Sequence, residues 1–425
     1  MARFTGIIGI IVILGLAYLW SNNRKAINFR LVITGLLLQV ALAIFILKVP
    51  VGQDIFAWLG KAINKLLDFS QQGGLFVFGD LTKVSKILPP SIVSAGVFLF
   101  ILIPTIIFVC VLVSMAYHVG LMQRVVAVLA RFVHWAMRVS GSEALSNVAS
   151  AFVGQVEAQI MIRPYLSGMT MSELLASMTG SMACIAGGVM AVYISMGVPA
   201  SYLLAASLMA APGALVISKI VFPETEQSET KGVVRLEVKK QYTNIMDAIS
   251  HGATDGMAIA TNVIAMLIGV IALVALVDAL LGYFGLFLGW TGISLDFIGL
   301  NVDNLRLKDV FGAFFSLFAI VMGVPPSESF EVGSLMGTKM VINEFVAYSD
   351  LSPMIHQGAL STKSIVIASF ALCGFANFSS IAIQLGGIGV MVPNRKADLA
   401  KLGFKAMICG TMASYISATL AGILL

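Results

Sequence analysis

Long apolar segments recur along this chain and are separated by short polar connections. Residues 31–49 are typical, because the only charged side chain among them is Lys48 near the end. A membrane-spanning helix needs about 20 mostly apolar residues. With 59% hydrophobic and 11% charged residues, the chain is also far from the roughly 25% charged of soluble domains. The sequence therefore predicts an all-α polytopic membrane protein with no soluble domain.

Eight apolar segments are predicted to cross the membrane: residues 4–20, 31–49, 93–117, 174–196, 202–221, 260–281, 364–392 and 402–425. The first lacks the small-residue cleavage pattern of a signal peptide, so we expect it to be retained. In two further segments apolar side chains recur at helical spacing among charged ones, which is typical of helices lying in the membrane interface. These are residues 54–69 and 122–139.

Two other segments, residues 142–167 and 310–345, are apolar but interrupted by polar residues, glycine and proline. Their most polar stretches are Val153–Glu157 and Val324–Glu328. Irregular backbone at membrane depth is tolerated only against protein or along a cavity, so each segment is predicted to be a re-entrant hairpin. A broken span follows each hairpin. Paired interruptions in two halves are typical of transporters with an inverted repeat and a central binding site.

Basic residues concentrate in loops 21–30, 118–173, 222–243 and 393–401. By the positive-inside rule these loops are cytoplasmic, which places both termini outside and makes the hairpins enter from opposite faces. The net charge of +5 therefore reflects membrane orientation and predicts no nucleic-acid partner. The four cysteines are isolated, and no P-loop, haem or H-E-x-x-H motif is present, so we expect no cofactor and no resident metal.

The polar residues of the hairpins and broken spans each allow two interpretations. Glu157 and Glu328 could accept hydrogen bonds from a hydroxyl- or amine-bearing solute or take up a coupling proton. Alternatively, each could pair with a nearby base. Asn377 and Ser380 lie three residues apart and share a face if helical. They could line the same cavity or only join helices. Asn343-Glu344 fits a helix cap.

The chain resembles the concentrative nucleoside transporter family over nearly its whole length. The resemblance is carried by four motifs in this order: Gly154-Gln155-Val156-Glu157, Gly323-Val324-Pro325 followed by Ser327-Glu328, Asn343-Glu344-Phe345-Val346-Ala347, and Gly374-Phe375-Ala376-Asn377-Phe378-Ser379-Ser380. The resemblance implies eight spans, two opposed re-entrant hairpins, interfacial helices, a homotrimer and an elevator mechanism in a bacterial inner membrane.

The family resemblance also implies a division of the chain. Residues 1–121 would form part of the scaffold, residues 122–222 the first transport part, residues 223–305 a cytoplasmic loop with a scaffold span, and residues 306–425 the second transport part. The substrates would be nucleosides such as uridine, cytidine and adenosine. Gln155 and Glu157 would bind the nucleobase, and Glu328, Asn377 and Ser380 the ribose hydroxyls. Phe375 and Val189 would line the site.

The coupling ion is predicted from departures within these motifs. In sodium-coupled members, the resemblance would place oxygen-bearing ligands at Ser150, Val153, Cys184 and Ile185. This chain has Ser150 where such members usually carry Asn, and Cys184 where they carry Ser. Sodium favours oxygen ligands, so proton symport is favoured, with Glu157 or Glu328 as the carrier. The alternatives are sodium symport or, from other classes, an intramembrane enzyme or a channel.

Overall fold

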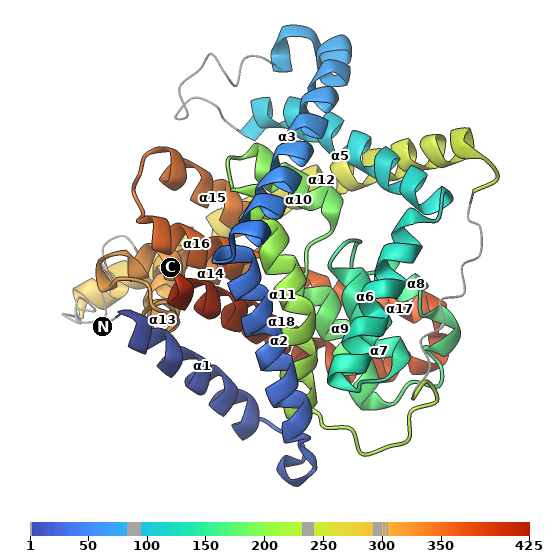
Figure 1. Ribbon diagram of the computed structural model, residues 1–425. Helices are drawn as coiled ribbons and strands as arrows, with labels where there is room; N and C mark the ends of the chain where they lie inside the picture. The colour runs from blue at the N-terminus through green and yellow to red at the C-terminus, as the bar shows by residue number, and fades with distance from the viewer. Residues whose placement is uncertain (1, 83–94, 232–241, 292–299, 301, 303–304) are drawn as a thin grey trace.

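The computed structural model describes residues 2–82, 95–231, 242–291, 300, 302 and 305–425 (Figure 1). Nearly all of this part is helical, as the sequence predicts. The helices are α1 (Ala2–Leu19), α2 (Phe29–Leu47), α3 (Pro50–Phe78), α5 (Ala95–His118), α6 (Leu121–Met137), α7 (Gly141–Ser150), α8 (Glu157–Ile160), α9 (Met171–Ala183), α10 (Gly187–Ser195), α11 (Ala200–Val221), α12 (Ile245–Trp290), α13 (Leu307–Met322), α14 (Ser329–Val341), α15 (Glu344–His356), α16 (Thr362–Leu372), α17 (Phe378–Met391) and α18 (Lys396–Leu424).

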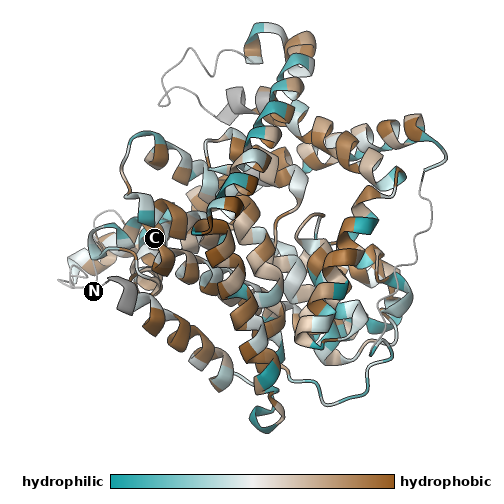
Figure 2. Cartoon of the chain, in the orientation of Figure 1, coloured by the Kyte–Doolittle hydropathy of each residue, from teal (hydrophilic) through white to brown (hydrophobic). Residues whose placement is uncertain are grey.

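Five stretches of helix in the described residues are long and apolar enough to cross a membrane: Phe29–Leu47, Met171–Ser195, Ala200–Val221, Ile271–Trp290 and Pro393–Leu424. A sixth candidate is the pair α5–α6, which is bent by 75°. Figure 2 shows apolar residues along α1 and α2 as well. A multi-pass helical membrane protein is therefore confirmed, while the number of eight spans stays a prediction. The first two residues of the predicted span 93–117 lie outside the described part.

Helices α9, α11 and α18 form the buried centre of the molecule (Figure 1). The spanning window of α11 is 89% buried and that of α18 is 78% buried, whereas that of α12 is 6% buried. Alanine recurs along α11, which also contains Gly213, and these small side chains let neighbouring helices approach closely. Gln39 of α2 reaches into this contact, where its Nε2 donates to the Met209 carbonyl at 3.0 Å and to Ser417 Oγ at 3.2 Å.

The two termini lie side by side (Figure 1). A Cβ added at Gly6 of α1 would meet the side chain of Ile423, near the end of α18. The termini are therefore on the same side of the molecule, in agreement with the prediction. Which side of the membrane they face stays a prediction.

Two series of helices follow the same order along the chain. Each has a helix, two shorter helices separated by a break, a broken span and a long buried helix. The first series is α6 to α11 and the second is α13 to α18. The broken spans are interrupted at residues 184–186, between α9 and α10, and at residues 373–377, between α16 and α17. The interruptions predicted at residues 186–188 and 377–380 overlap these breaks at their C-terminal ends, whereas a further break predicted at Gly386-Gly387 is wrong, because α17 is continuous there. The matching order fits the predicted inverted repeat.

The predicted position of the second hairpin is wrong by one helix. Gly323, with φ of +101°, ends α13, and Pro325 and Pro326 turn the chain into α14. By element order, the break that corresponds to hairpin 1 comes later, between α14 and α15. There the Asn343 side chain caps α15 by accepting the Val346 amide at 2.9 Å. We therefore call α7–α8 hairpin 1 and α14–α15 hairpin 2.

A buried ion cluster fastens hairpin 1 to the central helices. Lys219 of α11 is 5% exposed and pairs with Glu143 of α7, and its Nζ also lies 3.2 Å from Glu224 Oε2. Glu143 completes a capping box with Ser140 at the start of α7. Since breaking a buried pair costs about 3–5 kcal/mol, α7 and α11 are held together as one unit.

Candidate functional site

A cavity of about 1550 Å³ lies where hairpin 1, both broken spans and hairpin 2 meet α5 and α12. Its wall is apolar for the most part, with polar side chains at a few positions. This composition is typical of small-molecule sites, although such sites usually occupy about 300–1000 Å³. Tyr117, Gln123 and Arg163 also line the cavity.

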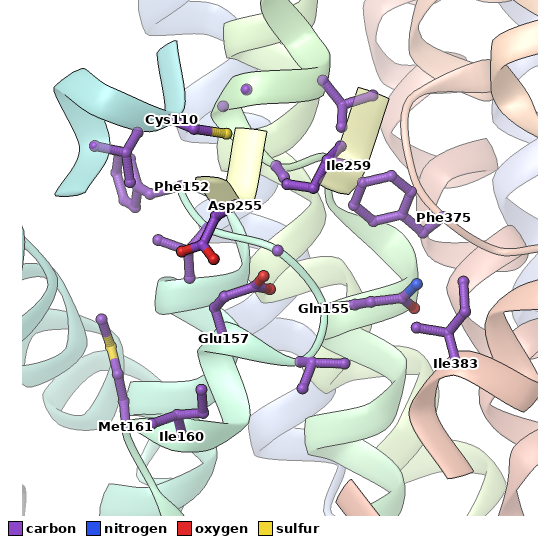
Figure 3. Close-up of a pocket in the computed structure, with 18 of the residues that line it drawn as sticks. Cys110, Phe152, Gln155, Glu157, Ile160, Met161, Asp255, Ile259, Phe375 and Ile383 are labelled. Carbon is purple, nitrogen blue, oxygen red and sulfur yellow. The ribbon is translucent and has the colours of Figure 1, made fainter. Parts of the chain in front are cut away.

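The tip of hairpin 1 is bonded to the helices around it. The Phe152 carbonyl accepts the Gly187 amide at 3.1 Å, and the Ala151 carbonyl accepts Ser207 Oγ at 3.1 Å. Gly154 has a specific role, because a Cβ there would collide with the Glu157 carboxylate. The glycine thus allows that carboxylate to fold back over the tip. Figure 3 shows Glu157 pointing toward Asp255 of α12.

Gln155 extends toward the other side of the cavity, toward Phe375 and Ile383 (Figure 3). Its Nε2 donates to Ser380 Oγ at 3.4 Å, and its Oε1 accepts Gln384 Nε2 at 3.5 Å. Both bonds are long, and the side chain is 9% exposed. Gln155 is therefore positioned by α17 but keeps capacity for hydrogen bonds with a ligand.

The two broken spans cross at their interruptions. Gly374 has φ of +133°, and a Cβ on it would lie 2.6 Å from the Ala183 carbonyl oxygen. The Phe375 amide donates to the Cys184 carbonyl at 3.3 Å. Only glycine accommodates both the conformation and the close approach. The crossing places Phe375 and the start of α17 beside the start of α10.

Hairpin 2 contributes a carboxylate at this crossing. Glu344 Oε2 accepts Asn377 Nδ2 at 2.8 Å, and Glu344 Oε1 accepts Tyr193 Oη at 3.2 Å. Asn377 is also the cap of α17, since its Oδ1 accepts the Ser380 amide at 2.9 Å. One amide side chain therefore joins hairpin 2 to the second broken span. Glu344, Asn377 and Ser380 all line the cavity.

Six of the seven residues predicted to bind substrate line this cavity: Gln155, Glu157, Val189, Phe375, Asn377 and Ser380. The structure does not place Glu328 with them. Its Oε2 accepts the amide and the hydroxyl of Ser361 at 3.1 and 2.8 Å, at the start of α16. Glu328 thus fastens the α13–α14 turn to the first turn of α16, and it is absent from the cavity wall.

The four residues predicted as cation ligands lie under the tip of hairpin 1. Ser150 Oγ donates to the Ser146 carbonyl at 2.7 Å and lies 3.0 Å from Ser181 Oγ. Cys184 Sγ donates to the Ser207 carbonyl at 3.6 Å. Val153 lines the cavity, whereas the side chain of Ile185 is fully buried. The two polar side chains of the set are therefore engaged with the protein itself.

Comparison with known proteins identifies the family. A sequence model described as "Na+ dependent nucleoside transporter C-terminus" matches residues 202–422. A second, for the N-terminus of the same group, matches residues 8–81, and a third, described as "Gate: Nucleoside recognition", matches residues 99–200. The chain belongs to the concentrative nucleoside transporter family.

Several family members are similar over almost the whole chain. An uncharacterized transporter of Haemophilus influenzae is 41% identical over 100% of this chain and 98% of its own. The nucleoside permease NupC of Helicobacter pylori is 35% identical, over 98% of this chain and 96% of its own. Among solved structures, CNTnw in an inward-facing substrate-bound state matches with a TM-score of 0.89 and 39% identity, covering 100% and 98%. A CNTnw variant in an outward-facing state matches with a TM-score of 0.91 and 39% identity, and the match covers 100% of this chain and 99% of the other. The family is one of transporters, not enzymes.

Several cavity residues were not predicted as ligands from the sequence, among them Glu344, Tyr193, Asp255 and Cys110. The sequence pattern of Asn343-Glu344 is compatible with a helix cap, and the motif that contains it also carries the family resemblance, but neither assigns a role to the Glu344 side chain. Tyr193 has no motif of its own. Asp255 and Cys110 face hairpin 1 from α12 and α5 (Figure 3). These side chains come from separate helices, and no local sequence pattern shows that the fold brings them together.

Proposed function

We propose that this protein imports nucleosides by symport with a cation across a bacterial inner membrane. The observation that carries the proposal is the meeting of Gln155, Glu344, Asn377 and Ser380 around one cavity. The family match and the names of relatives, such as the nucleoside permease of Helicobacter pylori, support the same conclusion.

The two ends of a nucleoside match the two ends of this polar set. The Gln155 amide has a donor and an acceptor, which suits the amide-like edge of a nucleobase, and Glu157 lies beside it at the tip of hairpin 1. The Glu344 carboxylate accepts hydrogen bonds only, which suits ribose hydroxyls. Phe375 and Val189 provide apolar contact. We assign the ribose carboxylate to Glu344 in place of Glu328 because only Glu344 lines the cavity.

The proposed coupling ion is the proton. Sodium sites are built from oxygen ligands, but at the predicted cation site under hairpin 1 the side chain of Cys184 offers sulfur. The hydroxyl of Ser150 is already bonded to Ser146 and Ser181. Among the described residues, the carboxylates that line the cavity are Glu157, Asp255 and Glu344, and we propose Glu157 or Glu344 as the proton carrier, in place of Glu328. Sodium coupling is the alternative, since the matching family model carries sodium in its description.

The proposed mechanism is an elevator in a homotrimer. The moving part would consist of residues 122–222 and 306–425, and residues 1–121 and 223–305 would form the scaffold. Two observations support this division. Hairpin 1 is fastened to α11 by the Lys219–Glu143 pair, and the spanning part of α12 is 6% buried, which leaves its apolar surface for lipid or for neighbouring subunits.

Radiolabelled uridine uptake into proteoliposomes tests the function. Separate proton and sodium gradients, each with the membrane potential clamped, should show accumulation driven by the proton gradient. Empty liposomes and liposomes without a gradient are the controls. Uptake of uridine, cytidine and adenosine no higher than in empty liposomes would refute nucleoside transport. Accumulation driven by sodium alone would refute proton coupling but retain the nucleoside function.

A further inference from the structure

Lys339 is one of the largest fully buried side chains of the protein, at 1% exposure. It lies in the last turn of α14, in hairpin 2, and has no part in the proposed contacts with substrate. Among the described residues no carboxylate forms an ion pair with it. A buried ammonium group without compensation is costly, so its surroundings must explain its presence.

The first compensation comes from the end of a helix. Lys339 Nζ donates to the Ala371 carbonyl at 2.9 Å, in the last turn of α16. The last carbonyl groups of a helix have no intrahelical partner and carry partial negative charge. Lys339 therefore holds hairpin 2 to the point where the second broken span is interrupted.

The second compensation comes from Glu344, five residues later in the same hairpin. The two groups interact electrostatically although they are too far apart to form an ion pair. Glu344 in turn accepts from Asn377, the cap of α17. Hairpin 2 thus presents its positive charge to the negative end of α16 and its negative charge to the positive end of α17. Both charges complement the helix ends that they face.

In the part of the chain that the structure describes, hairpin 1 has no equivalent of this lysine. The residue five positions before Glu157 is Phe152, and the end of α9 at Cys184 is bonded to Ser207 and Phe375. Of the two hairpins, hairpin 2 therefore carries a buried lysine five positions before its carboxylate, where hairpin 1 carries Phe152.

We propose that Lys339 is a positioning residue: a tethered cation that fixes the Glu344 carboxylate for ribose hydroxyls by holding hairpin 2 against the end of α16. This inference rests on the proposed nucleoside function. Removal of the charge would loosen hairpin 2 and leave Glu344 without its positive neighbour. The loss should then fall on recognition of the sugar hydroxyls and spare the nucleobase.

The test compares the binding of uridine and of 2′,3′-dideoxyuridine, which lacks the two hydroxyls, to the purified full-length protein by calorimetry. Lys339→Gln should weaken uridine binding by about tenfold, equivalent to ~1.4 kcal/mol, and change dideoxyuridine binding by less than about threefold, a smaller effect on the same scale. Lys339→Arg, which keeps the charge, should retain most of the preference for uridine. Lys219→Gln is the matched control, because it removes another buried lysine that is not part of the cavity wall.

The outcomes separate the two proposals. The positioning role is wrong if Lys339→Gln keeps the wild-type preference for uridine. It is also wrong if Lys339→Gln weakens the binding of both ligands equally, as expected for the control Lys219→Gln. A Glu344→Gln background provides a second check, since Lys339→Gln should then cause no further loss of preference. If Lys339→Gln does not fold, complete loss of the preference in Lys339→Arg overturns the proposal, and retention supports it. A wild-type protein that binds neither ligand would overturn this proposal and the nucleoside function together.

Discussion

Replacement of Glu344 by Gln should nearly abolish nucleoside transport, whereas the same replacement of Glu328 should not. In Glu344→Gln, one carboxylate oxygen becomes an amide that would face the donor groups of Asn377 or Tyr193. A hydrogen bond to a charged group contributes about 1.5–3 kcal/mol, and the proposed bond to the ribose would be lost as well. A total loss of about 2–4 kcal/mol corresponds to a decrease of roughly 30- to 1000-fold in transport efficiency.

The matched variant Glu328→Gln removes a carboxylate from the α13–α14 turn, outside the cavity. Its glutamine oxygen can still accept from Ser361, so we expect uptake within about twofold of the wild type, consistent with a neutral hydrogen bond that remains. Initial rates of proton-driven uridine uptake in proteoliposomes measure both effects, with thermal unfolding of each variant as the control for folding. A well-folded Glu344→Gln protein with normal uptake, or a well-folded Glu328→Gln protein without uptake, would refute the assignment.

Three further variants test the structure around the site. Lys219→Met should lower the free energy of unfolding by about 3–5 kcal/mol, because Glu143 is left buried without its partner; thermal unfolding in detergent measures this, and an unchanged melting temperature would contradict it. Gly374→Ala should cost about 1–3 kcal/mol through backbone strain and reduce uptake, because its φ is +133°; normal uptake would show that the crossing tolerates a Cβ. Ser150→Asn combined with Cys184→Ser adds oxygen ligands under hairpin 1 and should make uptake respond to sodium; no response to sodium gradients would exclude that place as the determinant of the coupling ion.

The apolar segments and the interruptions of the broken spans could be predicted because both depend on local composition. Runs of Leu, Ile and Val indicate membrane helices, and Gly187 or Asn377 within such a run indicates a break. These features gave the fold class, whereas the seven predicted substrate residues, six of which line the cavity, came from the motifs of the family resemblance. The same logic failed for hairpin 2. The Gly-Val-Pro-Pro stretch around Pro325 is the strongest local break signal of the second half, but it forms an ordinary turn between α13 and α14.

The true break of hairpin 2 lies just before Glu344, at Ile342-Asn343, and contains neither glycine nor proline. Asn343 ends the break by capping α15, which is common at helix starts in any protein and carries no sign of function. What distinguishes Glu344 is its distance of 2.8 Å from Asn377, a residue 33 positions away in the chain. Such proximity depends on how hairpin 2 packs against the second broken span. It therefore becomes visible only in the folded structure.

The arrangement of buried charge bears on which parts of the protein can move together. The Lys219–Glu143 pair joins hairpin 1 to α11, and Lys339 joins hairpin 2 to α16. Separation of either pair would leave a charge buried without its partner, at a cost of several kcal/mol. By contrast, the contacts of the cavity wall with α5 and α12 include Glu157 and Asp255, two exposed carboxylates that face each other. The least costly movement thus keeps both hairpins with the broken spans and separates them from α12. We therefore expect cross-links between hairpin 1 and α11 to preserve uptake, and cross-links between hairpin 1 and α12 to block it.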